Sequence, residues 1–136
     1  MPEAVIELQD VGKRYGRGDK AVEALRGLNL SVPRGSLYGL LGPNGAGKTT
    51  CLRILATLLA PDSGLVRVAG LDALTDPRGV RERLGYVAQE VALDKILSGR
   101  ELLQLQGDLY HLDRSERDRR ISELVELLAM GDWIDR

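Results

Sequence analysis

One short glycine-rich segment restricts the fold of this chain more than any other stretch. Residues 42–49 read Gly-Pro-Asn-Gly-Ala-Gly-Lys-Thr and match the pattern G-x-x-x-x-G-K-[ST]. The apolar residues 37–41 predict a short buried strand before the segment, and residues 49–59 predict a helix after it. A strand, a glycine loop and a helix in this order form a phosphate-cradling P-loop, so we expect an α/β nucleotide-binding domain.

Each part of this motif has a physical role in holding phosphate. Glycines 42, 45 and 47 let the backbone adopt positive φ angles and approach a ligand closely. The amide N–H groups then point at phosphate oxygens, and the helix N-terminus adds partial positive charge. We expect Lys48 to reach the β- and γ-phosphates and the Thr49 hydroxyl to hold Mg²⁺. The alternative is a glycine-rich turn that binds nothing.

The composition is that of one small globular domain. Of the 136 residues, 43% are apolar and 29% are charged, and the net charge is −1. This balance provides no basic surface for nucleic acid, so no nucleic-acid partner is expected. No run approaches the roughly 20 apolar residues that a membrane-spanning helix needs. The only cysteine, Cys51, cannot form a disulfide within the chain, which fits a reducing cytosol.

Alternating apolar and polar residues predict further strands on both sides of the motif. We expect them at residues 4–11 and 28–32 before it, with a loop at 12–20, and at residues 65–69 and 85–88 after it.

Helical patterns account for much of the remaining sequence. Asp76 and Pro77 predict the N-cap and first residue of a short helix. Two helices are expected to follow, the second beginning near Asp113 or at a capping box formed by Ser115 and Asp118 and ending at Gly131. The expected buried faces are Cys51, Ile54, Leu55 and Leu58 on the P-loop helix; Leu102, Leu105, Leu109 and Leu112 on the next; and Ile121, Leu124, Val125 and Leu128 on the last.

Stretches along the whole chain follow the pattern of one protein family. They are residues 42–50, residues 61–64 with the strand that ends at Ala69-Gly70, and residues 85–89, which place Gln89 41 residues after Lys48. Together they resemble the nucleotide-binding subunit of ATP-binding-cassette (ABC) transporters. Residues 93–102 are similar to the daunorubicin-resistance branch of drug exporters.

The resemblance implies a fold, a domain organisation and cofactors. The fold is an α/β P-loop NTPase of the ABC-cassette type, with an N-terminal antiparallel β subdomain, a P-loop core and the start of a helical subdomain. Residues 1–136 would be one partial nucleotide-binding domain, in which residues 1–89 form the β subdomain and P-loop core and residues 90–136 begin the helical subdomain. The implied cofactors are ATP and Mg²⁺.

The resemblance also assigns roles to single residues. Tyr15 matches the aromatic residue that stacks on adenine, since a tyrosine ring offers a flat apolar face to a base. Thr50 would add a phosphate contact, and Gln89 would complete the Mg²⁺ shell with Thr49 and sense the γ-phosphate. The alternative for Tyr15 is a surface tyrosine without a role, and that for Gln89 is a polar residue at a strand end. The residue before Gln89 is Ala88, where the family commonly has proline. The implied nucleotide-binding residues are Tyr15, Gly42, Pro43, Asn44, Gly45, Ala46, Gly47, Lys48, Thr49, Thr50 and Gln89.

Other parts of the family's catalytic machinery have no counterpart in the sequence. Residues 90–136 contain no apolar run followed by Asp-Glu (the Walker B motif), no Leu-Ser-Gly-Gly-Gln signature and no switch histidine. Residues 97–100 match only the first three letters of the signature and are interpreted as a helix start. We therefore expect an incomplete central sheet and an N-terminal fragment that ends before the signature, with no complete catalytic site; Lys48 and Gln89 would contribute to one.

For the parent protein, the resemblance implies an ATP-binding subunit that couples ATP binding and hydrolysis to export of a hydrophobic drug or lipid-like substrate. Its partners would be a membrane-spanning permease subunit and a second nucleotide-binding subunit. It would lie in the cytoplasm, peripheral on the inner face of the cell membrane. The 136-residue chain alone is expected to be inactive. The alternatives are a non-catalytic nucleotide-binding fragment and an inert truncated remnant.

Overall fold

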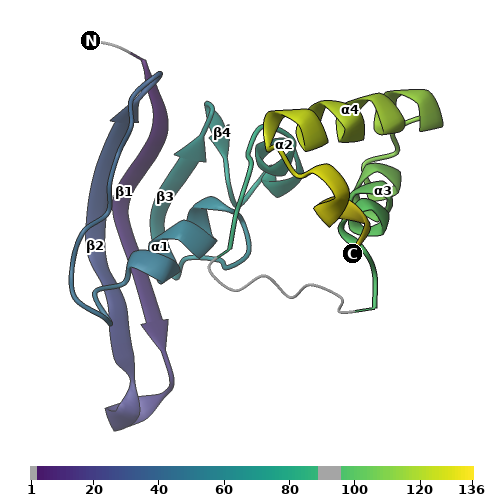
Figure 1. The fold of residues 1–136 in the computed structure, drawn as a ribbon. Coiled ribbons are helices and arrows are strands. Elements are labelled where there is room, and N and C mark those ends of the chain that lie inside the picture. The colour runs from purple at the N-terminus through teal and green to yellow at the C-terminus, as the bar shows by residue number, and fades with distance from the viewer. Residues whose placement is uncertain (1–2, 89–95) are drawn as a thin grey trace. The chain divides into compact units, whose positions relative to one another are not determined.

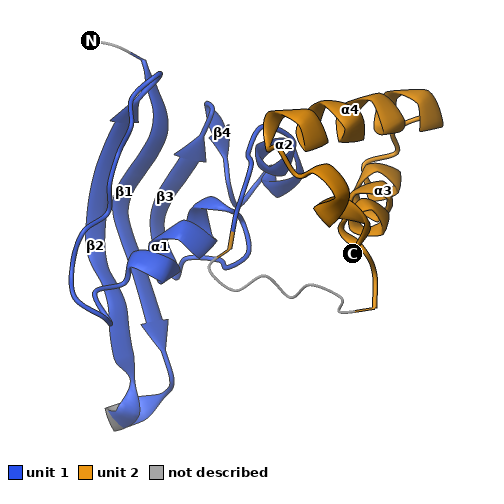
Figure 2. Cartoon of the chain, viewed as in Figure 1, with its two compact units in different colours: residues 1–87 blue, residues 88–136 orange. Residues whose placement is uncertain are grey.

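Two units make up the fold, which a computed structural model describes for residues 3–88 and 96–136 (Figures 1 and 2). The first comprises residues 1–87 and the second residues 88–136. Gln89 lies outside the described residues.

A four-stranded antiparallel sheet dominates the first unit. The strands are β1 (Ala4–Tyr15), β2 (Val22–Pro33), β3 (Ser63–Val68) and β4 (Leu71–Asp72), in the order β2-β1-β3-β4. Leu8 pairs with Leu30 on one side and Val66 on the other, so the alternating apolar residues share one face. The expected antiparallel β subdomain is therefore confirmed.

The β1–β2 hairpin is longer than the sequence pattern predicts. Residues 12–15 are strand and not loop, because Lys13, Arg14 and Tyr15 continue to pair with β2 across irregular, bulged positions. The connection between β1 and β2 contains a short 3-10 turn, η1 (Gly18–Lys20). Tyr15 is consequently held at a strand end.

The core of this unit lies between the sheet and α1 (Lys48–Leu55) (Figure 1). Its buried members are Leu8, Val11, Leu25, Cys51, Ile54, Leu55, Val66, Val68, Ala73 and Val80. The helix ends at Leu55, earlier than predicted, so Leu58 lies beyond it and is exposed instead of buried. The predicted helix at Asp76 is confirmed as α2 (Pro77–Glu82), where the Asp76 carboxylate accepts a hydrogen bond from the Gly79 N–H at 2.9 Å.

Two predicted strands are absent from the described residues. Residues 37–41 and 85–88 are neither helix nor strand, and Leu37, Leu41 and Val87 are almost fully exposed. A strand needs a neighbour to satisfy its backbone N–H and C=O groups, and no described segment pairs with either stretch. The prediction that residues 37–41 are a buried strand is therefore wrong for this chain, while the expectation of an incomplete central sheet agrees with the structure.

The second unit contains α3 (Gly99–Leu109), α4 (Arg114–Leu127) and a 3-10 turn, η2 (Gly131–Asp135). Residues 97–100 do begin a helix: the Ser98 side chain accepts from the Glu101 N–H, and the Glu101 side chain accepts from the Ser98 N–H. Asp113 is the N-cap of α4, so the capping box predicted at Ser115 is wrong; the Ser115 hydroxyl donates to Asp113 at 2.8 Å.

The leucine stripes predicted for these helices are largely exposed. Leu105, Leu109, Leu124 and Leu128 all lie at the surface. The helices instead approach through Gly107, where an added Cβ would lie 2.5 Å from Arg117 Cγ, and the buried side chains are Ile121 and Ile134. Gly131 does not stop α4, because Ala129 takes the left-handed conformation first. Within residues 3–88 and 96–136, no helix has the length and apolar character to cross a bilayer.

Candidate functional site

The glycine loop leads directly into the N-terminus of α1. Gly42, Gly45 and Gly47 have φ angles of +155°, +85° and +86°, as the motif predicts. Gly47 is the N-cap of α1, and the helix has neither a side-chain cap nor an acidic residue in its first turn. The first-turn N–H groups therefore face no anionic or capping side chain, which is the arrangement that suits a bound anion.

Gly47 also packs tightly against β2. A Cβ atom added there would lie 2.4 Å from the Ala24 carbonyl oxygen and 2.9 Å from Leu25 Cδ2. No side chain larger than hydrogen fits at that distance without moving the strand. The sheet therefore positions the loop, and the glycine allows the contact.

Lys48 folds back over the loop. Its ammonium donates to the carbonyl oxygens of Gly42 at 2.6 Å and Pro43 at 2.7 Å. These two bonds occupy two of the three N–H donors, leaving one to meet a ligand oxygen. The positive charge thus lies where the loop curves, next to the uncapped helix end.

Tyr15 and the P-loop helix, far apart in sequence, meet in the structure. The Tyr15 hydroxyl lies 3.4 Å from Thr50 Oγ1. Thr50 is 9% exposed and Tyr15 is 41% exposed, so the tyrosine presents part of its ring at the surface beside the loop. Pro43, Asn44, Ala46 and Thr49 are exposed as well. Of the implied nucleotide-binding residues, all but Gln89 belong to this region of the first unit.

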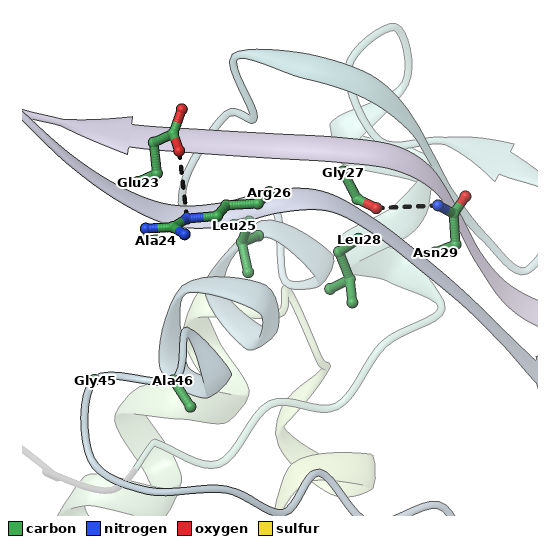
Figure 3. Close-up of a pocket in the computed structure, with 9 residues that line it drawn as sticks. All are labelled: Glu23, Ala24, Leu25, Arg26, Gly27, Leu28, Asn29, Gly45 and Ala46. Carbon is green, nitrogen blue, oxygen red and sulfur yellow. Dashed lines mark hydrogen bonds and ion pairs between the residues drawn. The ribbon is translucent and has the colours of Figure 1, made fainter.

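An open pocket of ≈630 Å³ lies between β2 and residues 45–46 of the loop (Figure 3). Gly45 and Ala46 form its loop side, and the β2 side consists of Glu23, Ala24, Leu25, Arg26, Gly27, Leu28 and Asn29. Glu23 and Arg26 form an ion pair of 3.3 Å, and the Asn29 amide donates to the Gly27 carbonyl at 3.0 Å. Sequence reasoning missed this lining, because no motif marks it and only the packing of the loop on β2 creates it.

The strand end that carries Tyr15 is anchored by Asp62. Its carboxylate accepts from Lys13 Nζ and from the Arg14 N–H, each at 2.7 Å. These bonds, that from Lys13 first, hold the pKa of Asp62 below its usual range. These bonds hold the backbone next to Tyr15 in place.

Other titratable groups near the loop have structural roles. Burial raises the pKa of the Cys51 thiol, which keeps it protonated and unreactive inside the core. The described part of the chain contains no cluster of three or more His, Cys, Asp or Glu side chains that could hold a metal ion.

Comparison with known proteins gives a consistent picture. Residues 25–136 match the family model described as ABC transporter. The chain is 46% identical over 132 residues to the daunorubicin resistance ATP-binding protein DrrA3 of Streptomyces coeruleorubidus, a match that covers 97% of this chain and 40% of that protein. It is 42% identical to the daunorubicin/doxorubicin resistance ATP-binding protein DrrA of Streptomyces peucetius, covering 100% and 40%. The chain thus spans about two fifths of the length of these relatives.

Solved structures show the same fold. One, described as the dimeric post-hydrolysis state of an ATP-binding cassette bound to ADP and Pi, superposes with a TM-score of 0.82 at 24% identity, covering 96% of this chain and 60% of that one. Another, an ATP-binding subunit of an ABC transporter, superposes with a TM-score of 0.76 at 26% identity, covering 96% and 53%.

Proposed function

This chain belongs to the ABC transporter family, and from that membership and its loop geometry we propose that it supplies the ATP-binding half-site of an exporter's ATP-binding subunit. The expected α/β fold of an ATP-binding cassette is confirmed. The observation that carries the proposal is the loop itself: three glycines at positive φ, an uncapped helix N-terminus and the Lys48 ammonium all converge on one place.

We assign the phosphate groups of ATP to this loop. The N–H groups of the loop and of the first turn of α1 would donate to phosphate oxygens, and Lys48 would neutralise their charge. Lys48 already lies over the loop, held by Gly42 and Pro43, so it needs little movement to meet a phosphate. Gly45 keeps the backbone open on this side, since nothing lies within 4 Å of a Cβ added there.

The first unit offers a candidate partner for the adenine and another for the metal. Tyr15 would stack on the base, which its partly exposed ring permits. Thr49 is exposed in the first turn of α1, so its hydroxyl could bind a Mg²⁺ ion that also binds the phosphates. Gln89, which lies outside the described residues, would be the second protein ligand. The ion would screen the charge of the β- and γ-phosphates. A direct phosphate contact by Thr50 stays part of this proposal.

For the complete subunit we propose a transported substrate and partners as well. Those in Streptomyces are named for resistance to daunorubicin and doxorubicin, which supports a hydrophobic drug or lipid-like substrate. The complete subunit would pair with a second copy and with a membrane-spanning permease at the inner face of the cell membrane. The 136 residues contain no apolar run ending in Asp-Glu, so we propose that this chain binds ATP and that turnover needs further parts of the subunit.

Titration of a fluorescent ATP analogue tests the proposal. The wild-type chain should bind it, and Lys48→Ala should weaken binding by about tenfold or more, because a hydrogen bond to a charged group contributes ~1.5–3 kcal/mol. Arg34→Ala is the matched control: it removes one exposed positive charge near the opposite end of β2 from Ala24. Equal binding by wild type and Lys48→Ala would refute the assignment. A steady, Lys48-dependent ATPase rate from the chain alone would refute its catalytic incompleteness.

A further inference from the structure

The contact between Tyr15 and Thr50 connects the proposed adenine position with the proposed phosphate position. Thr50 is the one polar or charged residue that the described part of the chain buries. A hydroxyl removed from water needs a hydrogen-bond partner, or its desolvation is uncompensated. The Tyr15 hydroxyl, 3.4 Å away, is the side-chain group that provides one.

Tyr15 can act as a fixed point because its backbone is restrained on both sides. Before it, Asp62 binds the Lys13 side chain and the Arg14 N–H, and its own N–H donates to the Gly12 carbonyl at 2.9 Å. After it, the chain turns at Gly16, where φ is +83° and an added Cβ would lie 3.2 Å from the Lys20 carbonyl oxygen. The ring is therefore carried by a strand end with little freedom to shift.

Thr50 lies in the same helical turn as Lys48. That turn begins at Gly47, whose contact with Ala24 fixes its start, and Lys48 holds the carbonyls of Gly42 and Pro43. A restraint on Thr50 therefore acts on the turn whose N–H groups face the phosphate position. The path from the tyrosine to the loop is continuous and lies within one unit.

We propose that the Tyr15 hydroxyl is a positioning group for the phosphate loop, acting through Thr50, in addition to the stacking role of the ring. The inference rests on the proposed function in that the ligand is ATP. The hydroxyl connects the ring that stacks on adenine with the phosphate loop. Binding of adenine at the ring therefore stabilises the loop, and binding of phosphate at the loop stabilises the ring. Phenylalanine at position 15 would keep the stacking surface and lose this connection.

Amide hydrogen exchange of the ligand-free chain tests the link without nucleotide. Tyr15→Phe and Thr50→Val should each accelerate exchange in residues 48–55 by about three- to tenfold, the range for one net hydrogen bond. The double variant should exchange no faster than either single variant. Thr50→Ser keeps the hydroxyl and should therefore retain the protection seen in the wild type. Tyr110→Phe, which removes an exposed hydroxyl in the second unit, should change nothing in α1. Unchanged exchange in Tyr15→Phe, or additive effects in the double variant, would overturn the link.

A comparison of two ligands then separates positioning from packing. Tyr15→Phe should bind adenosine as the wild type does, because the ring remains, and should bind the fluorescent ATP analogue about threefold or more weakly. Equal losses for both ligands, or none, would overturn the positioning role. If instead the wild type binds neither ligand, or Lys48→Ala binds like wild type, the proposed function fails, while the exchange experiment still decides whether the link exists.

Discussion

Replacing Gly47 by alanine is the sharpest test of how the loop is held. The residue has φ +86°, and a Cβ there would lie 2.4 Å from the Ala24 carbonyl oxygen. Gly45, two residues earlier in the same loop, has φ +85° and no atom within 4 Å of an added Cβ. The two substitutions therefore place a methyl group at nearly the same positive φ, and they differ in the contact with β2.

The magnitudes follow from this difference. A left-handed conformation costs a non-glycine residue roughly 1–2 kcal/mol, which both variants incur. At Gly47 the added methyl group is also about 1 Å too close to Ala24, and overpacking of this kind costs about 1–3 kcal/mol more. Gly45→Ala should thus lose ~1–2 kcal/mol and Gly47→Ala ~2–5 kcal/mol of local stability.

Amide exchange in residues 22–33 and 48–55 measures this local opening. Because 1.4 kcal/mol corresponds to a tenfold change in an equilibrium constant, Gly47→Ala should exchange about five- to hundredfold faster than Gly45→Ala in both segments. Equal acceleration in the two variants would show that the approach of Gly47 to Ala24 does not hold the loop on the strand. Faster exchange in Gly45→Ala would refute the reasoning altogether.

Two further predictions concern the core and the strand anchor. Val80 is 0% exposed, so Val80→Ala should destabilise the first unit by about 2 kcal/mol through lost burial and the cavity left behind. Val22 is 64% exposed, so the control Val22→Ala should cost under about 0.5 kcal/mol. Urea denaturation followed by circular dichroism compares the two variants, and equal effects would contradict the burial of Val80 in the core. The pKa of Asp62 is depressed in the folded chain, so its contribution is present above the unfolded pKa, about 3.9, and is lost as pH falls through the lower folded value. Protection of β1 at Lys13–Tyr15, corrected for intrinsic exchange, should therefore fall below about pH 4 in wild type and vary less in Asp62→Asn; parallel profiles would remove Asp62 as the anchor.

Local signals in the sequence predicted local structure well. The cap at Asp76 and the helix start at residues 97–100 depend on contacts within four positions, and both are present. The antiparallel strands were also predictable in type, because their apolar alternation reflects a single buried face. The ends of these strands were not predictable, because the β1–β2 hairpin continues through irregular, bulged pairs as far as Tyr15.

Predictions that depended on absent or distant neighbours failed. Residues 37–41 have an apolar composition typical of a buried strand, but an extended segment without a pairing partner is not part of a sheet. Leu105 and Leu124 follow helical spacing, yet the helices meet at Gly107, so that face stays at the surface. Periodicity indicates which residues can be buried together and does not indicate what covers them.

The sequence by itself determined the phosphate loop, its three glycines, Lys48 and the family to which the chain belongs, because these depend on residue types at fixed spacing along the backbone. Only the tertiary structure decided that Gly47 lies against Ala24, that β2 forms a wall of the pocket beside the loop, and that Tyr15 reaches Thr50. The contact of Gly47 with Ala24 joins residues 23 positions apart, and that of Tyr15 with Thr50 joins residues 35 positions apart. Such contacts arise from the packing of a helix on a sheet, which no local sequence pattern indicates.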